Sequence, residues 1–178
     1  MKVLDNMLIS EPWPHMIVDD YYDNDLFINA KKEIIAFLIK RRPKRRLVYS
    51  THDATFSKNL PETTKCLNSV DPLIYAGYFK NHRKYTTPKI HHEVSFIISE
   101  FEYPIHDEIE KKVFSFVTYI APANGIGTLI YDKNKNYVKE VEWKTNRTLI
   151  FAGLTGITWH NYKADNRPRI TINTFLTT

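Results

Sequence analysis

Residues 169–176 read RITINTFL, a run in which polar and apolar side chains largely alternate. A period of two is typical of a β-strand that buries one face. Six earlier runs are also short and either apolar or alternating: IHHEVSFIISEF (90–101), VFSFVTYIA (113–121), GTLIYD (127–132), YVKEVEW (137–143), RTLIFAG (147–153) and ITWH (157–160). Turn-forming residues such as PANG and KNKN separate the runs. Strands at this spacing predict a double-sheet jelly roll or a barrel.

Before residue 89 the clearest pattern is helical. Asp23-Asn24-Asp25 can cap a helix, and apolar side chains then recur at helical spacing: Phe27, Ala30, Ile34, Phe37 and Leu38. A shorter helix is expected over about residues 62–68. The polar stretch 78–88 is expected to form a loop or lid.

We therefore expect a mostly β protein with N-terminal helices. Residues 1–178 are predicted to form one domain, with helical support mainly in 23–70 and jelly-roll strands mainly in 89–178. With 178 residues, 43% of them hydrophobic, the chain can bury the hydrophobic core of a single domain. A nucleotide-binding α/β fold is disfavoured, because strands and helices do not alternate and no Gly-rich phosphate loop is present.

The chain has one cysteine, Cys66, so no disulfide can form within it. This is typical of proteins from a reducing compartment. The start of the chain lacks the apolar stretch of a signal peptide, and no segment reaches 18 apolar residues. We expect a cytoplasmic protein with no membrane partner.

Much of the formal net charge of +5 is local, because residues 40–46 read KRRPKRR. Such a run can contact nucleic acid or another polyanion. It can also be the solvated end of a helix, where basic side chains complement the helix dipole before a proline. The second interpretation is favoured, because no aromatic residues interleave with the charges for base stacking.

A second motif, His106-Asp107-Glu108, lies just before the run 113–121. In an extended chain residues i and i+2 face the same way, so His106 and Glu108 point together and Asp107 points opposite. With His160 from a later strand they would form a facial set of two histidines and one carboxylate. That set leaves three positions of an octahedral Fe(II) open. Asp107 is the alternative carboxylate ligand if the backbone turns early.

Nine residues after His160 stands Arg169, within the alternating run. It is expected to face inward together with Thr171 and Asn173. An arginine in that place can bind a carboxylate in a bidentate pair. Arg167 precedes Pro168 in a turn and is expected to be exposed.

The other histidines are expected not to bind a metal. His91 and His92 would point to opposite faces of one strand. His15, His52 and His82 are expected to lie in turns.

Four stretches together resemble the Fe(II)- and 2-oxoglutarate-dependent oxygenases, in particular the compact prolyl-hydroxylase-like members known from phages and bacteria. They are YPIHDEIEKKVFSFVTYIAP (103–122), GIGTLIYD (125–132), KTNRTLIFAG (144–153) and TWHNYKADNRPRITINTF (158–175). The opening PWPHMIVDDYYDNDLF (12–27) is similar to the first strand and helix start of such enzymes. The resemblance is weakest between about residues 45 and 88, and it implies a double-stranded β-helix, or jelly roll.

The resemblance also implies roles for individual residues. His106 and His160 match the family's iron-binding histidines, and Glu108 stands where the family usually has aspartate. Arg169 matches the arginine that binds the C5 carboxylate of 2-oxoglutarate, and Thr171 matches its hydroxyl-bearing neighbour. Tyr119 corresponds to a tyrosine that hydrogen-bonds the same carboxylate, although it can equally be a core residue.

The implied cofactors are Fe(II), 2-oxoglutarate as co-substrate and O2, with ascorbate as a candidate reductant. The implied reaction is hydroxylation of a C–H bond, coupled to conversion of 2-oxoglutarate into succinate and CO2. A prolyl residue or an amino-acid-like molecule, free or in a peptide, is the first expectation for the substrate. Three alternatives remain: a nucleic-acid-directed oxygenase of the same family, a catalytically silent jelly-roll binding module, and a cupin-like metal enzyme that needs no 2-oxoglutarate.

Overall fold

The computed structural model describes residues 8–44, 46–84, 86, 88–97 and 101–178. In chain order its elements are β1 (Leu8–Ile9), β2 (His15–Val18), α1 (Asn24–Arg41), β3 (Arg46–Ser50), α2 (Phe56–Asn59), α3 (Pro61–Leu67), α4 (Pro72–Ala76), a 3₁₀ turn (Gly77–Phe79), β4 (Lys89–Ile97), β5 (Lys112–Ala121), β6 (Thr128–Tyr131), β7 (Tyr137–Val141), β8 (Thr148–Ala152), β9 (His160–Tyr162) and β10 (Arg169–Thr177).

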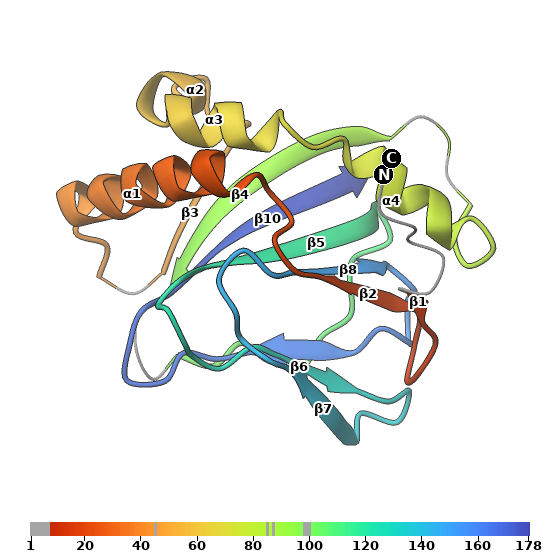
Figure 1. The fold of residues 1–178 in the computed structure, drawn as a ribbon. Helices are drawn as coiled ribbons and strands as arrows, with labels where there is room; N and C mark the ends of the chain where they lie inside the picture. The colour runs from red at the N-terminus through yellow and green to blue at the C-terminus, as the bar shows by residue number, and fades with distance from the viewer. Residues whose placement is uncertain (1–7, 45, 85, 87, 98–100) are drawn as a thin grey trace.

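The strands form two antiparallel sheets. The larger has the order β1-β2-β8-β5-β10-β4-β3, and the smaller has the order β7-β6-β9. Figure 1 shows α1, α2 and α3 on one side of the large sheet and the small sheet on its other side. The chain is therefore mostly β with helices concentrated in its first half, as its sequence predicts.

Six of the seven runs predicted to be strands coincide closely with a strand of the structure, and the seventh meets one only at its end. The run 157–160 was expected to be extended, yet only His160 belongs to β9, since residues 155–157 form a turn. Gly156 adopts a φ of 75° in that turn, a conformation that suits glycine. The edge strand β3 is not predicted from its sequence. Residues 98–100 of the first run lie outside the described residues.

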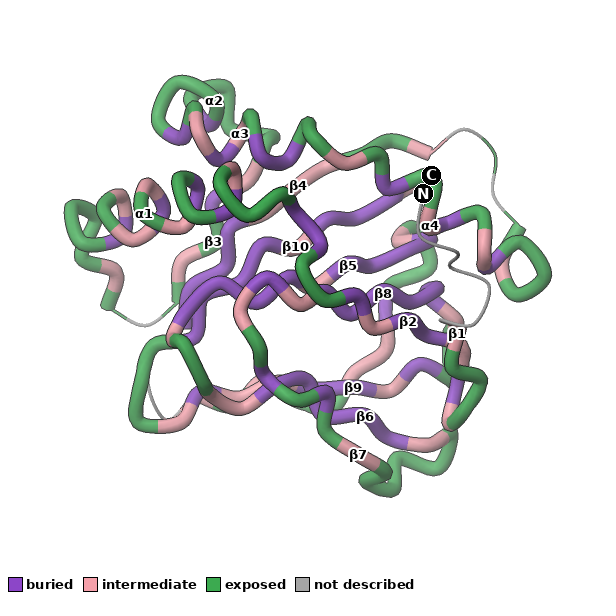
Figure 2. The backbone as a smooth tube through the Cα atoms, in the orientation of Figure 1, coloured by how far each residue is buried: buried purple, intermediate pink, exposed green. Residues whose placement is uncertain are grey.

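The alternation in β10 separates the two faces of the large sheet. Ile170, Ile172 and Leu176 point toward the helices and join the larger hydrophobic core. Arg169 and Asn173 point to the opposite face, toward the small sheet, where they line a cavity. Figure 2 shows that β10, β5 and β8, at the centre of the sheet, are almost entirely buried.

Helix α1 covers the first of these faces. Its buried side chains are Phe27, Ala30, Ile34 and Leu38, which repeat every three or four residues. Full burial of a side chain such as Ile34 contributes about 1.5–3 kcal/mol. The predicted helix is confirmed, and so is the shorter one, which the structure places at Pro61–Leu67.

A second hydrophobic cluster lies on the side of the small sheet. It contains Trp13, Tyr119, Ile130, Val141, Trp143, Leu149 and Phe151. These side chains join β5 and β8 of the large sheet, and Trp13 ahead of β2, to β6 and β7. One predicted site residue, Tyr119, belongs to this cluster. No helix in the described part of the chain is long and apolar enough to cross a membrane.

Candidate functional site

A cavity of about 90 Å³ opens between the two sheets. Four of the predicted site residues line it: His106, Glu108, His160 and Arg169. They come from segments far apart in the sequence, and antiparallel pairing brings these segments together. Tyr119 and Thr171 are buried next to the cavity.

The two histidines face each other across a short antiparallel bridge. The N–H of His106 donates to the carbonyl of His160 at 3.0 Å, and the N–H of His160 donates to the carbonyl of His106 at 2.9 Å. Their ring centroids are 4.3 Å apart. The bridge therefore places two imidazoles side by side at the cavity wall.

Backbone carbonyls determine the tautomer of both rings. Nδ1 of His106 lies 2.9 Å from the carbonyl oxygen of Pro104, and Nδ1 of His160 lies 2.8 Å from that of Thr158. A carbonyl can only accept, so Nδ1 carries the proton in each ring. In the neutral ring Nε2 then keeps its lone pair, which is the form that binds metals.

His160 is held in this neutral form. It is 4% exposed, and burial lowers its pKa to about 4, although nearby Glu108 acts in the opposite direction. The ring of Phe151 lies edge-on against it, with centroids 4.9 Å apart. Near pH 7 the imidazole is therefore uncharged and available as a ligand.

Glu108 shares the cavity, but both of its carboxylate oxygens have protein partners. Ser115 donates to Oε1 at 2.6 Å, and the ammonium of Lys112 lies 3.1 Å from Oε2. Burial favours the neutral acid, yet His160, Lys112 and the Ser115 hydrogen bond together keep the pKa of Glu108 below its ordinary value. The group is therefore a carboxylate that is already neutralised by a lysine.

Glu108 is also close to the sheet backbone. A Cβ at Gly153 would stand 2.2 Å from the carbonyl oxygen of Lys112 and 3.3 Å from Cβ of Glu108. Glycine is required there because any side chain would push the Glu108 segment away from β5 and β8.

These contacts test how well the residues fit an iron ion. Within the described ranges, no three His, Cys, Asp or Glu side chains lie close enough together to hold a metal. The histidine pair fits, whereas the carboxylate of Glu108 is bonded to Lys112 and Ser115. The role of Glu108 as third ligand therefore stays a prediction. Asp107, the alternative, accepts a hydrogen bond of 2.5 Å from the N–H of Gly156.

Arg169 is the most unusual group of the site. It is 5% exposed, and its Nε and Nη2 have no hydrogen-bond partner. Its Cζ lies 4.8, 5.3 and 5.6 Å from the ring centroids of Tyr162, Trp143 and Tyr119. Burial lowers the pKa of Arg169, but a guanidinium retains its charge in proteins. A buried charge with unsatisfied donors is costly, and the predicted binding of a carboxylate by Arg169 would satisfy them.

Thr171 adds a second unsatisfied group close by. Its hydroxyl is buried without a partner, and it pairs in register with Ser95 on β4 and Tyr119 on β5. Residues two apart on a strand share a face, so Thr171 lies beside Arg169. Both residues carry buried donors without a partner, and their binding of a carboxylate stays a prediction.

The Tyr119 hydroxyl is already hydrogen-bonded within the protein. It donates to Oγ1 of Thr128 and accepts from the N–H of Thr128, both at 3.0 Å. The ring stacks on Trp143 with centroids 4.5 Å apart. The Tyr119 ring therefore packs near Arg169, and a hydrogen bond from its hydroxyl to a co-substrate stays a prediction.

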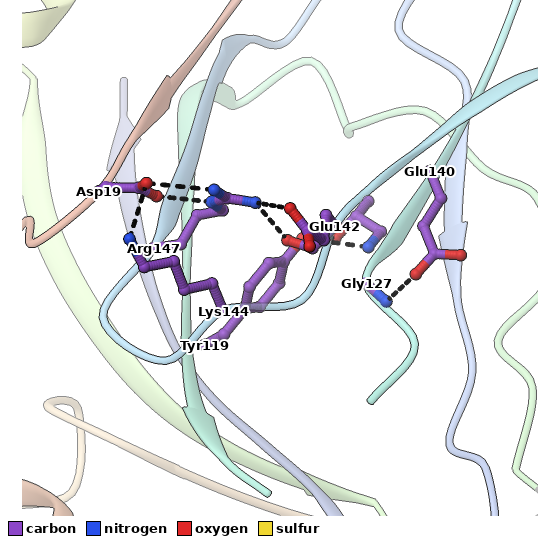
Figure 3. A network of polar contacts seen from close by, with 8 residues as sticks. Asp19, Tyr119, Gly127, Glu140, Glu142, Lys144 and Arg147 are labelled. Atoms are coloured by element: carbon purple, nitrogen blue, oxygen red, sulfur yellow. Dashed lines mark hydrogen bonds and ion pairs between the residues drawn. The ribbon is translucent and has the colours of Figure 1, made fainter. Parts of the chain in front are cut away.

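The backbone of Tyr119 is anchored by the turn at Arg147, whose guanidinium lies between Asp19 and Glu142 in Figure 3. The N–H of Tyr119 donates to the carbonyl of Arg147 at 3.0 Å. The Arg147 guanidinium in turn donates to Asp19 at 2.6 Å and to Glu142 at 3.1 Å. The Arg147 hydrogen bond holds the pKa of Asp19 at about 2. This surface network ties Asp19, directly after β2, to the turn that anchors Tyr119.

The remaining histidines do not line the cavity. His91 lies 3.5 Å from Glu93, and Nδ1 of His92 bonds the Thr174 hydroxyl at 2.8 Å. One expectation is wrong, because His15 is not in a turn. It is the first residue of β2, fully buried against the edge of the Trp13 ring.

The described residues of the basic run 40–46 lie in different surroundings. Arg41 lies over the rings of Phe37 and Tyr49, and Arg42 ends α1 in a left-handed conformation. Arg46 alone among its described residues lines the cavity. Arg45 lies outside the described residues, and so do Tyr85 and Thr87 of the predicted loop 78–88.

Arg167 is exposed as expected and bonds Asp165 and Asn124.

Several residues of the site were not singled out from the sequence, among them Lys112, Tyr103 and Tyr162, which line the cavity, and Ser115, which bonds Glu108. A local signal existed for Lys112, which follows Glu108 by four residues and carries the opposite charge. The others depend on contacts between distant strands.

No family model matches the sequence, and no curated protein matches it. Several solved structures are similar to this chain in fold. A prolyl hydroxylase from Trichoplax adhaerens, in complex with a hypoxia-inducible-factor peptide fragment, superposes with a TM-score of 0.70 at 14% identity, covering 98% of this chain and 89% of that one. A Pseudomonas putida prolyl-4-hydroxylase gives 0.61 at 10% identity, covering 98% and 94%.

A viral collagen prolyl hydroxylase from Paramecium bursaria chlorella virus-1, in a 2-oxoglutarate complex, gives a TM-score of 0.60 at 11% identity, covering 92% and 95%. These similarities confirm the predicted jelly roll. They also confirm the resemblance to compact prolyl-hydroxylase-like oxygenases at the level of the fold.

Proposed function

We propose that this chain is an Fe(II)- and 2-oxoglutarate-dependent dioxygenase that hydroxylates a prolyl residue or an amino-acid-like substrate. One observation carries the proposal: the buried guanidinium of Arg169, whose Nε and Nη2 have no partner, lines the same cavity as two imidazoles whose Nδ1 atoms are bonded to backbone carbonyls. The fold shared with prolyl hydroxylases supports it.

His106 and His160 would hold the iron, with Glu108 as the expected third ligand. Bound together, Fe(II), 2-oxoglutarate and O2 supply the oxidant that converts C–H into C–OH, with release of succinate and CO2. Arg169 and Thr171 would orient the co-substrate by binding its distal carboxylate. Val117, Phe175 and the tyrosine rings would limit the access of water to the reacting atoms.

The first experiment is anaerobic titration of the protein with Fe(II) and then 2-oxoglutarate, following the visible charge-transfer band of the chelate. We expect a band in the wild type and none in His106→Ala or His160→Ala. Arg169→Gln should raise the Kd for 2-oxoglutarate roughly 100-fold, because a charge-assisted bidentate contact is lost. Arg167→Gln is the matched control, since that arginine is exposed and should leave the Kd unchanged.

A second function, a silent jelly-roll binding module, is favoured by one contact, the Lys112–Glu108 ion pair. A folded wild-type protein without any band would support it. An unchanged Kd in Arg169→Gln would refute the proposed role of Arg169.

A further inference from the structure

One wall of the cavity is a stack of two arginines and two tyrosines. Cζ of Arg46 lies 5.3 Å from the Tyr103 ring centroid, and the Tyr103 and Tyr162 rings are stacked 4.9 Å apart at 12°. Cζ of Arg169 lies 4.8 Å from the Tyr162 centroid on the far side. All four side chains line the cavity, so the stack carries a guanidinium at each end.

The sheet register explains this arrangement. Arg46 on β3 and Arg169 on β10 both pair with Ile97 on β4. Residues directly opposite each other share a face, so both arginines point toward the cavity. Figure 1 shows β3, β4 and β10 side by side. Arg169 is buried and Arg46 is exposed, which places one at the floor and the other at the mouth.

Neither arginine pairs with a carboxylate of the part of the chain that the structure describes. Among the described residues, Arg46 forms no ion pair, and two nitrogens of Arg169 have no partner. The two acidic residues that line the cavity have partners of their own, because Glu108 pairs with Lys112 and Glu93 lies 3.5 Å from His91. The cavity therefore has two free positions for anions.

We propose that Arg46 binds a carboxylate of the primary substrate while Arg169 binds that of the co-substrate. This inference rests on the proposed function and adds a substrate class to it. Tyr103 contacts both Arg46 and His106, with centroids of the two rings 4.7 Å apart, so one ring separates Arg46 from the candidate iron ligand. An extended peptide advances about 3.5 Å per residue. The carboxylate is thus that of the target amino acid itself or of an acidic residue within about one to three positions.

A nucleic acid fits this wall less well. Bases bind single-stranded sites by stacking on free aromatic faces. Tyr103 has Tyr162 on one face and Arg46 over the ring, while Tyr162 lies between Tyr103 and Arg169. The rings are already stacked, and the guanidinium at the mouth is the group left to pair.

The test measures binding before turnover. The protein is titrated with N-acetyl-L-proline and, separately, with its uncharged amide, and binding is followed by intrinsic fluorescence. Each titration is done in the presence and in the absence of Mn(II) and 2-oxoglutarate. Two proline-centred peptides, with Asp or Asn next to the proline, form the second arm. In at least one of the two ligand pairs, we expect the charged ligand to bind at least about 10-fold more tightly than the uncharged one, because one charge-assisted contact provides that much affinity. Preference in the first pair identifies an α-carboxylate, and preference in the second identifies an acidic side chain.

Arg46→Gln should abolish the preference, and Arg46→Lys should restore part of it. Arg42→Gln, an exposed arginine that does not line the cavity, is the matched control and should keep the preference. Equal binding of charged and uncharged members, no binding of either, or a preference that survives in Arg46→Gln would each overturn the inference. Salt-sensitive binding of single-stranded DNA that is lost in Arg46→Gln would overturn it in favour of a nucleic acid.

The proposed function is judged separately, by the charge-transfer band. A carboxylate preference without a band would refute the oxygenase and leave the Arg46 subsite standing. A band without a preference would support the oxygenase and refute the Arg46 subsite.

Discussion

Lys112 is paired with Glu108, the carboxylate that is predicted to bind iron. Its ammonium lies 3.1 Å from Oε2 of Glu108 and 3.7 Å from the ring centroid of Phe175. A buried carboxylate needs a compensating positive charge. A metal ion bound by Glu108 would therefore compete with Lys112 for the same oxygen.

Lys112→Met tests this competition. Without metal, the free energy of unfolding should fall on the order of 3 kcal/mol, because a buried carboxylate loses its partner. Mn(II) should then raise the Tm more in this variant than in the wild type. Thermal unfolding in chelator and in Mn(II) measures both effects.

Lys111→Met is the control, since Lys111 is exposed next to Lys112. An Mn(II) shift in Lys112→Met no larger than in this control would show that Glu108 does not bind the metal.

At the scale of the element, α1 illustrates how local chemistry sets the ends of a helix. Oδ1 of Asp23 accepts from the N–H of Asp25 at 3.1 Å and of Leu26 at 3.2 Å, which satisfies two free donors of the first turn. Arg42 closes the other end with φ 47° and donates its N–H to the carbonyl of Leu38. Both ends are exposed, so capping rather than packing decides where the helix begins and ends.

Asp23→Ala should therefore lower the free energy of unfolding by about 1 kcal/mol. Urea denaturation with an unchanged m-value would measure it. Asp23→Asn keeps an acceptor oxygen and should lose a few tenths of that amount. An equal loss in both variants would mean that the charge of Asp23, and not its hydrogen bonds, stabilises the helix.

At the scale of the whole molecule, burial of histidines links stability to pH. Burial lowers the pKa of His15, His92 and His160 to about 4, whereas an unfolded histidine titrates near 6.5. Between those values the unfolded chain binds more protons than the folded chain. The contribution of these histidines to the free energy of unfolding is fully present above pH 6.5 and decreases as the pH falls toward 4. Asp19, with a pKa of about 2, adds a further loss below pH 4.

His15 offers a direct test, because it lies apart from the candidate iron ligands. At pH 5 its burial should cost about 2 kcal/mol relative to pH 7, as follows from the shift of its pKa. His15→Phe should therefore lose less Tm between pH 7 and pH 5 than the wild type. His82→Phe, at an exposed turn, is the control. The same loss in all three proteins would show that His15 is not the source.

Local patterns predict much of this molecule. Alternation alone places Arg169 on one face of β10 and Ile170 on the other, because the backbone of a strand fixes the direction of each side chain. By the same rule, the side chains of His106 and Glu108 point into one cavity, and the side chain of Asp107 points away from it. Helical spacing and a capping aspartate likewise predict α1.

By itself, then, the sequence determined the strand faces, the helix ends and the histidine pair as a candidate site, since each depends on neighbours within a few residues. The tertiary structure decided which distant groups meet. It placed His15 in the core and brought Arg46 of the unpredicted edge strand β3 to the cavity mouth. Strand pairing and burial depend on residues far apart in the sequence, so no short pattern around His15 or Arg46 could predict these positions.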